Sequence, residues 1–386
     1  MKILYIIDSL KGYGAEKSVV NLAGKLQHFT PVFIQIYEGD QLKCFLEEKN
    51  ITVYSLNLPS KSKFDLAVDI ISPIIEEENP VIIHSTLFRA DMISRKLKKK
   101  FPKILLVGSL VSNSYGKNRY NQLSFISKLK LLSTQLRDRF SSHNVDYFIS
   151  NSFAIKNTNI KALGLPEKKI KVIYRGRKME NPTINHEKIA ALKKSLNIRN
   201  EIIFLNVGRL SLGKGQIDLI RSFKIFAEQR SDVLLFIAGE GDIQEELENL
   251  INEMDLGNKI FLLGYRNDIP ELLSIANFFV FPSYFEGLPG ALVEAIISET
   301  PCIASNIAEN EECFPPEGAI FFHPGKIEEF SGKLKEVLLI ENWKDRTSMS
   351  LNYARQNFDL KKVSKTYESF CLEILQKHNL KKNRNI

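Results

Sequence analysis

Cysteine is scarce in this sequence of 386 residues. The four cysteines are Cys44, Cys302, Cys313 and Cys371. No two of them form a CxxC pair, so the sequence predicts neither a zinc site nor a disulfide framework, and a reducing cytoplasm suits it. No run of about 18 apolar residues occurs, so we expect no membrane span. The start, MKILYIIDSLKG, has an apolar run too short for a signal helix and no small-residue cleavage site, which predicts a cytoplasmic protein.

Several catalytic motifs are also missing. The sequence contains no GxSxG nucleophile elbow and no HExxH zinc motif. It lacks the complete Walker motif GxxxxGK[ST], which excludes a P-loop. It also lacks any D-x-D, a carboxylate pair that commonly carries a metal. These absences predict a protein with no bound metal and no cofactor.

Charge is plentiful but unevenly placed. The content of 44% hydrophobic and 25% charged residues is that of a soluble globular protein. Residues 1–180 carry 29 Lys and Arg against 16 Asp and Glu, an excess of +13, and the remainder carries 24 against 29, or −5. A basic half joined to a mildly acidic half indicates that the halves meet different partners. No recognisable nucleic-acid-binding motif occurs, so we expect no nucleic acid among them.

Short apolar runs such as KILYIID and IIFLNVGR alternate with helix-length segments along the chain. Most of them lack polar alternation, which is typical of parallel strands buried on both faces. The pattern predicts the α/β fold class, with two Rossmann-like domains of doubly wound parallel sheets facing across a cleft. The polar stretch 175–188 is the expected linker. We therefore expect domains over 1–178 and 179–360, followed by a helix and basic tail over 361–386.

Two cations lie in a loop after the strand-like run IIFLNV. Arg209 and Lys214 flank a glycine-containing segment that leads into a helix-like run. Arg binds phosphate oxygens through two parallel hydrogen bonds and Lys acts as a point charge, so together they suit a diphosphate. The alternative is a surface loop with ordinary charges.

Two strand ends in the first half give weaker signals. Gly12 and Gly14 precede a helix that we expect to begin near Ala15, where backbone N–H groups can receive an anion. The alternative is an ordinary strand-to-helix turn. His84 lies in VIIHS, which we place at the C-terminal end of a strand. It is either a hydrogen-bonding site residue or a satisfied structural histidine.

The stretch FPSYFEGLPGALVEAI, residues 281–296, holds two glutamates. Glu286 lies in a loop after an apolar run, and Glu294 lies inside an apolar helix-like run whose preceding amides, at Leu288 and Gly290, can meet a phosphate. Burying an unpaired carboxylate is costly, so Glu294 needs a partner. The two adjacent hydroxyls of a ribose suit it, and Glu286 would then hold a second polyol, a sugar. The alternative for either glutamate is a salt bridge to a neighbouring lysine.

Four segments are VGRLSLGKG, AGEGDIQEELE, LLGYRNDIPELLSIANFFVFPSYFEGLPGALVEAI and ETPCIAS. Together they resemble the retaining glycosyltransferases of family 4, also called glycosyl transferases group 1, which have the GT-B fold. The resemblance covers nearly the whole chain and is strongest over residues 202–306. The two glutamates separated by seven residues, preceded by the loop with Arg and Lys, make it specific.

The resemblance implies an enzyme that transfers a sugar from a nucleotide diphosphate sugar, here a UDP-sugar, to an acceptor hydroxyl with retention at the anomeric carbon. The first domain would bind the acceptor, a glycan or lipid-linked precursor, and the second domain would bind the donor. A C-terminal helix over 351–377 would cross back onto the first domain. Because the leaving group is a diphosphate, stabilisation of developing negative charge would be the largest catalytic term.

The resemblance also implies site residues. Arg209 and Lys214 would bind the donor diphosphate, Glu294 the ribose and Glu286 the transferred sugar. The implied catalytic residues are Glu286, His84, Arg209 and Lys214. The implied donor-binding residues are Gly14, Arg209, Lys214, Tyr265, Arg266, Glu286, Gly287, Leu288, Gly290 and Glu294. Within these sets, Gly14 would bring backbone close to the phosphates, His84 would lie near the transferred sugar, and Tyr265 and Arg266 would lie beside the nucleobase.

Some residues depart from the pattern of that family. Tyr13 stands where many members have glycine, and YRGRK stands where many have an Asn-Gly turn, which leaves the donor sugar open. An NAD-dependent epimerase or dehydrogenase would need GxGxxG after the first strand, and GYGAEK does not match it. A non-catalytic binding subunit would be expected to lack Arg209, Lys214 or a glutamate. A soluble small-molecule acceptor stays an alternative to a lipid-linked one.

The first half contains one basic stretch that predicts an amphipathic helix, KNRYNQLSFISKLKLLSTQLRDRF. Its apolar positions recur every three or four residues: Tyr120, Leu123, Ile126, Leu129, Leu132, Leu136 and Phe140. The flanking cations are Lys128, Lys130, Arg137 and Arg139. One interpretation is a core-facing helix with solvated charges. The other is a helix lying on an anionic membrane surface, which would place the protein peripherally on the cytoplasmic face near a lipid-linked acceptor.

Overall fold

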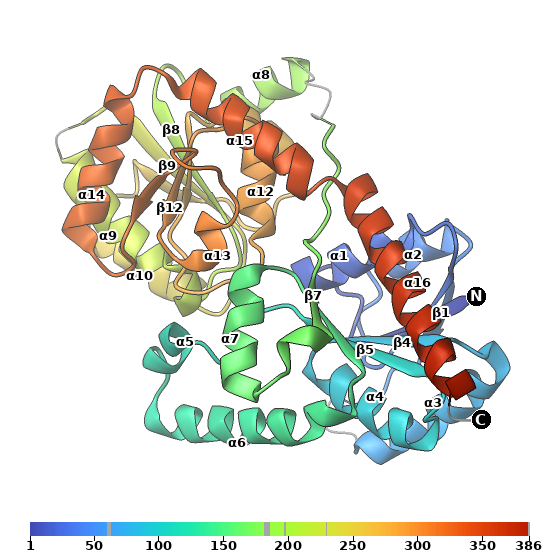
Figure 1. Cartoon of the computed structure of the whole chain (residues 1–386). Helices are drawn as coiled ribbons and strands as arrows, with labels where there is room; N and C mark the ends of the chain where they lie inside the picture. Colours follow the sequence, from blue (N-terminus) through green and yellow to red (C-terminus); the bar gives the residue numbers. More distant parts are fainter. Residues whose placement is uncertain (60–62, 181–185, 197, 229, 385–386) are drawn as a thin grey trace. The chain divides into compact units, whose positions relative to one another are not determined.

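The computed structural model describes the chain except residues 60–62, 181–185, 197, 229 and 385–386. The chain divides into two compact units, drawn in Figure 1. Unit 1 comprises residues 1–116, 123–178 and 357–386, and unit 2 comprises residues 117–122 and 179–356. The predicted domain bounds at residues 178 and 360 stay predictions, and the units divide the chain after residue 178 and again after residue 356. Part of the expected linker, 181–185, lies outside the described residues.

The sheet of unit 1 has seven parallel strands in the order β3-β2-β1-β4-β5-β6-β7. Their bounds are β1 (Lys2–Ile7), β2 (Thr30–Gln35), β3 (Thr52–Ser55), β4 (Ile82–Thr86), β5 (Leu105–Leu110), β6 (Tyr147–Ser150) and β7 (Ile170–Val172). Both faces are buried, because β1 sends Ile3, Tyr5 and Ile7 into one core and Leu4 and Ile6 into the other. This burial explains why the apolar runs lack polar alternation.

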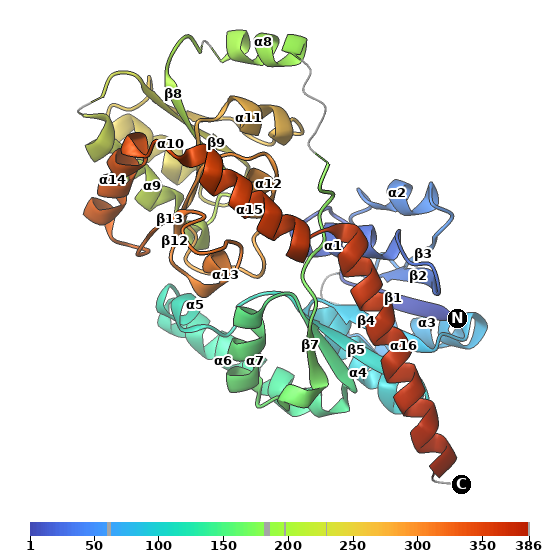
Figure 2. The same ribbon diagram turned by 45° about the horizontal axis from the view of Figure 1, so that its top comes forward.

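Helices cover both faces of this sheet. Those that lie in unit 1 are α1 (Gly14–Ala23), α2 (Lys43–Glu47), α3 (Phe64–Glu78), α4 (Phe88–Lys100), α6 (Phe125–Ser141), α7 (Phe153–Leu163) and α16 (Leu360–Arg384). Figure 1 and Figure 2 show α16 extending along unit 1 from its end near α1. Its residues Val363, Tyr367 and Ile374 join the core on the β1 side. The last helix of the chain therefore completes the unit in which the chain begins.

The expected single helix over 351–377 is wrong, because the chain forms two helices there. The first, α15 (Trp343–Asn357), ends before Phe358, and α16 begins at Leu360. In the break, the backbone pairs with residue 177: Arg177 donates its N–H to the carbonyl of Phe358 at 2.7 Å, and Leu360 donates to the carbonyl of Arg177 at 2.9 Å. These two long-range hydrogen bonds replace the intrahelical ones.

The sheet of unit 2 has six parallel strands in the order β10-β9-β8-β11-β12-β13. Their bounds are β8 (Ile202–Val207), β9 (Val233–Ala238), β10 (Ile260–Leu262), β11 (Phe278–Phe281), β12 (Cys302–Ser305) and β13 (Ile320–Phe322). In β9 the side chains of Val233, Leu235 and Ile237 enter one core, and the alternate residues Leu234 and Phe236 are buried on the other side. The two doubly wound parallel sheets of the prediction are confirmed.

Most helices of unit 2 follow its strands in βα alternation, whereas α5 and α8 precede its first strand. They are α5 (Lys117–Asn121), α8 (His186–Ser195), α9 (Gln216–Ala227), α10 (Gln244–Glu253), α11 (Ile269–Ile275), α12 (Gly290–Ile297), α13 (Ala308–Glu311), α14 (Ile327–Glu336) and nearly all of α15. A 3₁₀ turn, η3 (Leu212–Lys214), precedes α9. Among the described residues, no helix combines the length and apolarity that a membrane span needs.

The basic amphipathic stretch forms a helix that is shorter than predicted. Tyr120 belongs to α5, and α6 begins at Phe125, where the Ser124 hydroxyl caps it by accepting the N–H of Ser127. None of the residues of α6 is buried. The interpretation of a core-facing helix is therefore wrong, because the apolar positions of α6 do not enter a core.

Candidate functional site

The strand order of unit 2 reverses between β8 and β11. In open parallel sheets, ligands bind outside the carboxyl ends of the strands at such a reversal. The loop after β8 carries Arg209 and Lys214, and the loop after β11 carries Glu286. The predicted phosphate-binding cations and the predicted sugar-binding carboxylate thus meet at the point of the sheet where its topology favours a ligand.

Glycines bring the loops at this edge into backbone contact. Gly239, with φ of +144°, lies so close to the carbonyl of Gly208 that any Cβ would overlap it. Gly215, with φ of +71°, caps the start of α9 against the carbonyl of Pro282. Side chains at these positions would force the loops after β8, β9 and β11 apart. The glycines therefore hold the three loops at a fixed spacing.

Lys214 and Glu286 form an ion pair. The Lys214 Nζ lies 2.5 Å from Glu286 Oε1 and 5.6 Å from the centre of the Phe281 ring. The Glu286 side chain is only 9% exposed and the Lys214 side chain 26%. The alternative of a glutamate–lysine salt bridge is therefore realised for Glu286, and its partner is the lysine predicted to bind phosphate. The ion pair therefore places a cation and a carboxylate side by side at the strand-order reversal of unit 2.

Tyr284 ties the two loops together. Its backbone N–H donates to the carbonyl of Gly213 at 2.9 Å, and its hydroxyl donates to the carboxylate of Asp218 in α9. Burial and this hydrogen bond raise the pKa of Tyr284 above its ordinary value, so the phenol stays protonated. Sequence reasoning missed both residues, because no local motif indicates a hydrogen bond between side chains 66 positions apart.

The helix α12 follows the Glu286 loop directly. Gly287 and Leu288 are buried, and the helix begins at Gly290, with its N-terminus toward the carboxyl edge of the sheet. Glu294 is half-buried in the second turn, next to the buried Leu292, Val293 and Ala295. The sequence therefore predicts correctly that Glu294 is a carboxylate in an apolar helix. Its contact with a ribose stays a prediction.

Arg209 and Tyr265 also lie in loops at the carboxyl edge of the sheet of unit 2. The Arg209 side chain is exposed, and its carbonyl accepts a hydrogen bond from the buried Gln216 at 3.2 Å. Tyr265 follows β10, is 64% exposed, and donates its N–H to Glu240 at 3.4 Å. Arg266 pairs with the carboxylate of Asp268. Both the Arg209 and Tyr265 side chains can therefore meet a ligand without rearrangement of the core.

Gly14 and His84 belong to unit 1 and are described separately. Gly14 is the first residue of α1, one position before the expected start. The carboxylate of Glu16 accepts the Tyr13 N–H at 2.8 Å and the Ser9 hydroxyl at 2.6 Å. A carboxylate thus already occupies this helix N-terminus, and the contact of Gly14 with a phosphate stays a prediction.

His84 lies inside β4 rather than at its end, so the expected location is wrong. The ring is 3% exposed, with Nδ1 2.8 Å from the Tyr367 hydroxyl and Nε2 2.8 Å from the Ser109 hydroxyl. Burial lowers the pKa of His84 to about 3, so the imidazole is neutral. Both nitrogens are engaged within unit 1, which favours the structural interpretation of this histidine. A contact with the transferred sugar stays a prediction.

Two carboxyl groups at the carboxyl edge of the first sheet also escaped the sequence analysis. Asp8 directly follows β1 and accepts the N–H of Ala90 at 2.7 Å, and Asp91 accepts the Ser85 hydroxyl at 2.5 Å. Desolvation raises the pKa of Asp8 to about 6 and that of Asp91 to about 7. Each can therefore hold a proton near neutral pH. An aspartate directly after an apolar strand was the signal that could have found Asp8.

Known proteins resemble this chain in sequence and in fold. Residues 188–356 match the family model described as "Glycosyl transferases group 1". A UDP-Gal:alpha-D-GlcNAc-diphosphoundecaprenol alpha-1,3-galactosyltransferase from Escherichia coli is 38% identical over 164 residues, which are 40% of this chain and 41% of that protein. The chain thus aligns with less than half the length of that relative. The capsular polysaccharide biosynthesis glycosyltransferase CapH from Staphylococcus aureus is 25% identical over 81% of this chain and 83% of its own.

Solved structures extend the likeness to the whole fold. HepE from Anabaena, in complex with UDP, superposes with a TM-score of 0.82 over 97% of this chain and 100% of its own, at 21% identity. Sucrose-phosphate synthase from Thermosynechococcus elongatus gives a TM-score of 0.80 over the same shares at 16% identity. At these identities the comparison supports the fold alone. The fold predicted from the resemblance is confirmed.

Proposed function

We propose that this chain, whose residues 188–356 match the family model Glycosyl transferases group 1, moves a sugar from a nucleotide diphosphate sugar to an acceptor hydroxyl. The observation that carries the proposal is the Lys214–Glu286 pair at the strand-order reversal of unit 2, with Arg209 on the same loop. The match to the family model spans all three residues.

The cations act on the departing diphosphate. As the bond from the anomeric carbon to the phosphate oxygen breaks, negative charge grows on the nucleotide diphosphate. Arg209 donates to its oxygens in bidentate fashion, Lys214 supplies a second positive charge, and the amides of Leu288 and Gly290 add neutral donors. Donors already in place cost no reorganisation when the charge develops, which is the main source of such catalysis.

The glutamates divide the rest of the donor between them. In this proposal Glu286, which holds Lys214, receives the hydroxyls of the transferred sugar, so one carboxylate orients both the sugar and the cation that meets the phosphate. Glu294, further along α12, receives the ribose. Tyr265 and Arg266 lie beside the nucleobase. The roles of Glu286 and Glu294 each use a partly buried carboxylate, which a polyol can satisfy with two hydroxyl donors.

The donor in this proposal is a UDP-sugar, the transfer retains the anomeric configuration, and no metal is required. The uridine nucleotide is supported by the printed names of the Escherichia coli relative and of the HepE complex, which both include UDP. Retention follows from the family 4 resemblance, in which the acceptor attacks the same face that the diphosphate leaves and a donor phosphate oxygen takes its proton. Two cations and helix amides supply the charge that a metal would otherwise provide.

The acceptor is a lipid-linked or cell-surface glycan precursor. The Escherichia coli relative is named for a diphosphoundecaprenol acceptor, and CapH is named for capsular polysaccharide biosynthesis. An enzyme with such an acceptor works at the cytoplasmic membrane face as a peripheral protein. The second candidate is a soluble small-molecule acceptor, and the third is a non-catalytic nucleotide-sugar-binding subunit.

A thermal-shift screen of nucleotide diphosphates and their sugars tests this function most directly. A ligand that binds only the native state raises the melting temperature by mass action, so UDP and one or more UDP-sugars should raise it while ADP and GDP raise it less. Slow hydrolysis of the same UDP-sugar, measured by UDP release with and without EDTA, tests catalysis and metal independence. The absence of a shift with every nucleotide sugar contradicts the proposal, and binding without turnover favours the non-catalytic subunit.

A further inference from the structure

The helix α6 is turned with its apolar side outward. Phe125 is 75% exposed, Phe140 72% and Ile126 66%, and the apolar residues between them, Leu129, Leu132 and Leu136, are exposed as well. A surface helix of a globular protein ordinarily presents such a stripe to the core. Scattered exposed apolar side chains are common, but a contiguous stripe along four turns of one helix indicates a binding surface.

The inward side of α6 is mostly polar, so the orientation is fixed by specific contacts. Gln135 donates to the carbonyl of Ala162 at 3.0 Å. Asp138 accepts a hydrogen bond from Arg95 of α4 at 2.7 Å and another from the Tyr115 hydroxyl at 2.8 Å. The Arg95 and Asp138 side chains are 5% and 13% exposed. A rotation of α6 that buried the leucines would break these contacts. The hydrogen bonds of Gln135 and Asp138 therefore keep the apolar stripe of α6 facing outward.

Cations border the stripe on both sides. At about 100° per residue, Lys128 and Arg139 lie along one edge of the apolar face and Lys130 and Arg137 along the other. The helix contains one acidic residue, Asp138, and its carboxylate faces inward to Arg95. The outward surface of α6 is thus an apolar stripe between two rows of positive charge.

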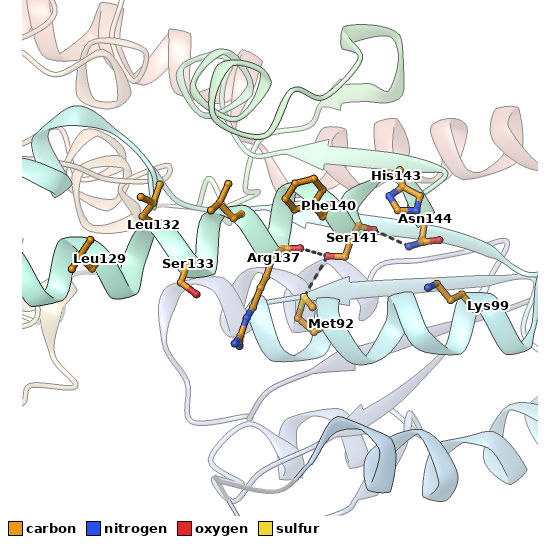
Figure 3. Close-up of a pocket in the computed structure, with 11 residues that line it drawn as sticks. Met92, Lys99, Leu129, Leu132, Ser133, Arg137, Phe140, Ser141, His143 and Asn144 are labelled. Atoms are coloured by element: carbon orange, nitrogen blue, oxygen red, sulfur yellow. Dashed lines mark hydrogen bonds between the residues drawn. The ribbon is translucent and has the colours of Figure 1, made fainter.

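A groove beside α6 continues this surface onto α4. It has a volume of about 630 Å³, and its apolar walls come from Met92, Leu129, Leu132, Leu136 and Phe140. Lys99, Arg137 and His143 lie among its lining residues. Figure 3 shows Leu132 and Phe140 along one side of α6 and Arg137 reaching from the other side, with Lys99 on the neighbouring helix. An apolar trough with a cationic border offers places for both a hydrocarbon chain and a phosphate.

We propose that this outward face of α6, with its groove, is the surface through which the protein docks on an anionic lipid bilayer. Its apolar side chains enter the boundary between headgroups and acyl chains, while Lys128, Lys130 and Arg137 extend to lipid phosphates. A second copy of the chain fits the face less well, because a symmetric contact would place like charges together. The proposal rests on the proposed function only for the reason to dock, which is access to a lipid-linked acceptor.

Co-sedimentation with vesicles tests this docking without any sugar transfer. The chain of 386 residues is mixed with vesicles of phosphatidylcholine alone or of equal parts phosphatidylcholine and phosphatidylglycerol, at low and high salt. We expect it to pellet with the anionic vesicles at low salt and to be released by salt, because each basic residue near the surface adds a screened attraction.

Two sets of variants assign the binding to α6. Phe125→Ser, Ile126→Ser and Phe140→Ser together should lower the vesicle partition coefficient about tenfold or more, since they remove the inserted apolar groups. Lys128→Glu with Lys130→Glu should lower it by about tenfold to a hundredfold on anionic vesicles. The matched controls are Leu339→Ser with Leu380→Ser, which are exposed apolar residues outside α6, and Lys361→Glu with Lys362→Glu on α16. Both controls should bind as the wild type does.

The outcomes separate the inference from the function. If the wild type stays in the supernatant with anionic vesicles at low salt, or if the α6 variants bind as well as the controls, the docking proposal is overturned. A concentration-dependent dimer that disappears in the triple serine variant would instead make α6 an interface between copies. The thermal shift with UDP tests the proposed function independently, because none of the α6 residues belongs to the donor site.

Discussion

Lys214 is proposed to bind the donor diphosphate, and it also pairs with the largely buried carboxylate of Glu286. Hydrogen bonds to charged groups contribute roughly 1.5–3 kcal/mol, so Lys214→Ala and Arg209→Ala should each lower transfer about tenfold to a hundredfold. Lys214→Ala should also lower the free energy of unfolding by about 1–3 kcal/mol, since it leaves the 9% exposed Glu286 without its cation. Arg209→Ala should not, because that side chain is exposed. Initial rates and urea denaturation measure both effects, and wild-type turnover in the double variant would contradict the assignment of Arg209 and Lys214 to the donor diphosphate.

The two glutamates should separate in a binding experiment. Glu294→Gln should weaken the affinity for UDP itself, because Glu294 is assigned to the ribose. Glu286→Gln should leave UDP affinity nearly unchanged while lowering transfer, because Glu286 is assigned to the sugar. Calorimetric titration with sugar-free UDP, compared with UDP-sugar, provides the measurement. Equal losses of UDP affinity in both variants would show that the roles are divided wrongly.

His84 gives the stability of the protein a defined dependence on pH. Burial lowers its pKa from 6.5 to about 3, so below pH 6.5 the unfolded chain binds a proton that the native chain does not. Stability is therefore lost as the pH falls, by about 2 kcal/mol between pH 6.5 and 5. Asp8 and Asp91, whose pKa values are raised to about 6 and 7, act in the opposite direction over this window. The comparison of wild type with His84→Asn isolates the histidine.

In that comparison, urea denaturation at pH 7 and pH 5 should show a smaller loss of stability for His84→Asn than for the wild type. Parallel pH dependences would mean that the imidazole is protonated in the folded protein. That result would also disagree with the buried contacts to Tyr367 and Ser109, which are the structural basis of the shift.

Residue types predict chemistry better than they predict contacts. The sequence places Arg209, Lys214 and Glu286 after strands that are expected to be parallel. Since the carboxyl ends of parallel strands lie at the same edge of a sheet, these residues are expected there together. The sequence offers a salt bridge to a neighbouring lysine only as an alternative for the glutamates and does not identify Lys214 as the partner of Glu286, because periodicity gives no side-chain distance. The hydrogen bond from Tyr284 to Asp218 and the engagement of His84 with Tyr367 join residues far apart in the chain. Such partners depend on packing that the local pattern does not encode.

At the scale of elements, the junction of η3 and α9 determines where Lys214 lies. Gly215→Ala should destabilise unit 2 by about 1–3 kcal/mol, since φ of +71° and the approach of the Pro282 carbonyl both exclude a Cβ. Gly332→Ala within α14 is the matched control. It has open space around it and should stabilise by about 0.5–1 kcal/mol. Thermal unfolding of both variants gives the comparison, and an unaffected Gly215→Ala protein would show that the junction is adaptable.

Strands were easier to anticipate than helices. Each expected strand forms, because a short, continuous apolar run bounded by polar residues can bury both of its faces as a strand of a parallel sheet. Two helical expectations failed for different reasons. The helix over 351–377 is divided by backbone pairing with Arg177, which is more than 170 positions away in the chain. The outward face of α6 has the periodicity of a core-facing helix, and periodicity alone does not indicate which side of the stripe the protein occupies.

At the scale of the whole molecule, the two units have separate hydrophobic cores, and tryptophan fluorescence can follow the unfolding of unit 2 alone. The single tryptophan, Trp343, packs on Phe278 in unit 2. Ile374 is 1% exposed in the core of unit 1, so Ile374→Ala should destabilise that unit by about 2–5 kcal/mol. Far-UV circular dichroism should show an earlier transition in urea, while the midpoint from tryptophan fluorescence stays close to that of the wild type. Equal shifts of both signals would show that the units unfold as one.

The return of the chain to unit 1 has a consequence for its biosynthesis. A ribosome releases residues 1–178 first, yet Tyr367, the partner of Tyr5 and His84, emerges only after all of residues 179–356. During that interval the nascent first unit lacks the helix that covers part of its β1-side core, and its apolar surface is available to chaperones. The second unit, by contrast, can form its sheet as soon as its last strand is made. The domain that begins first is therefore completed last.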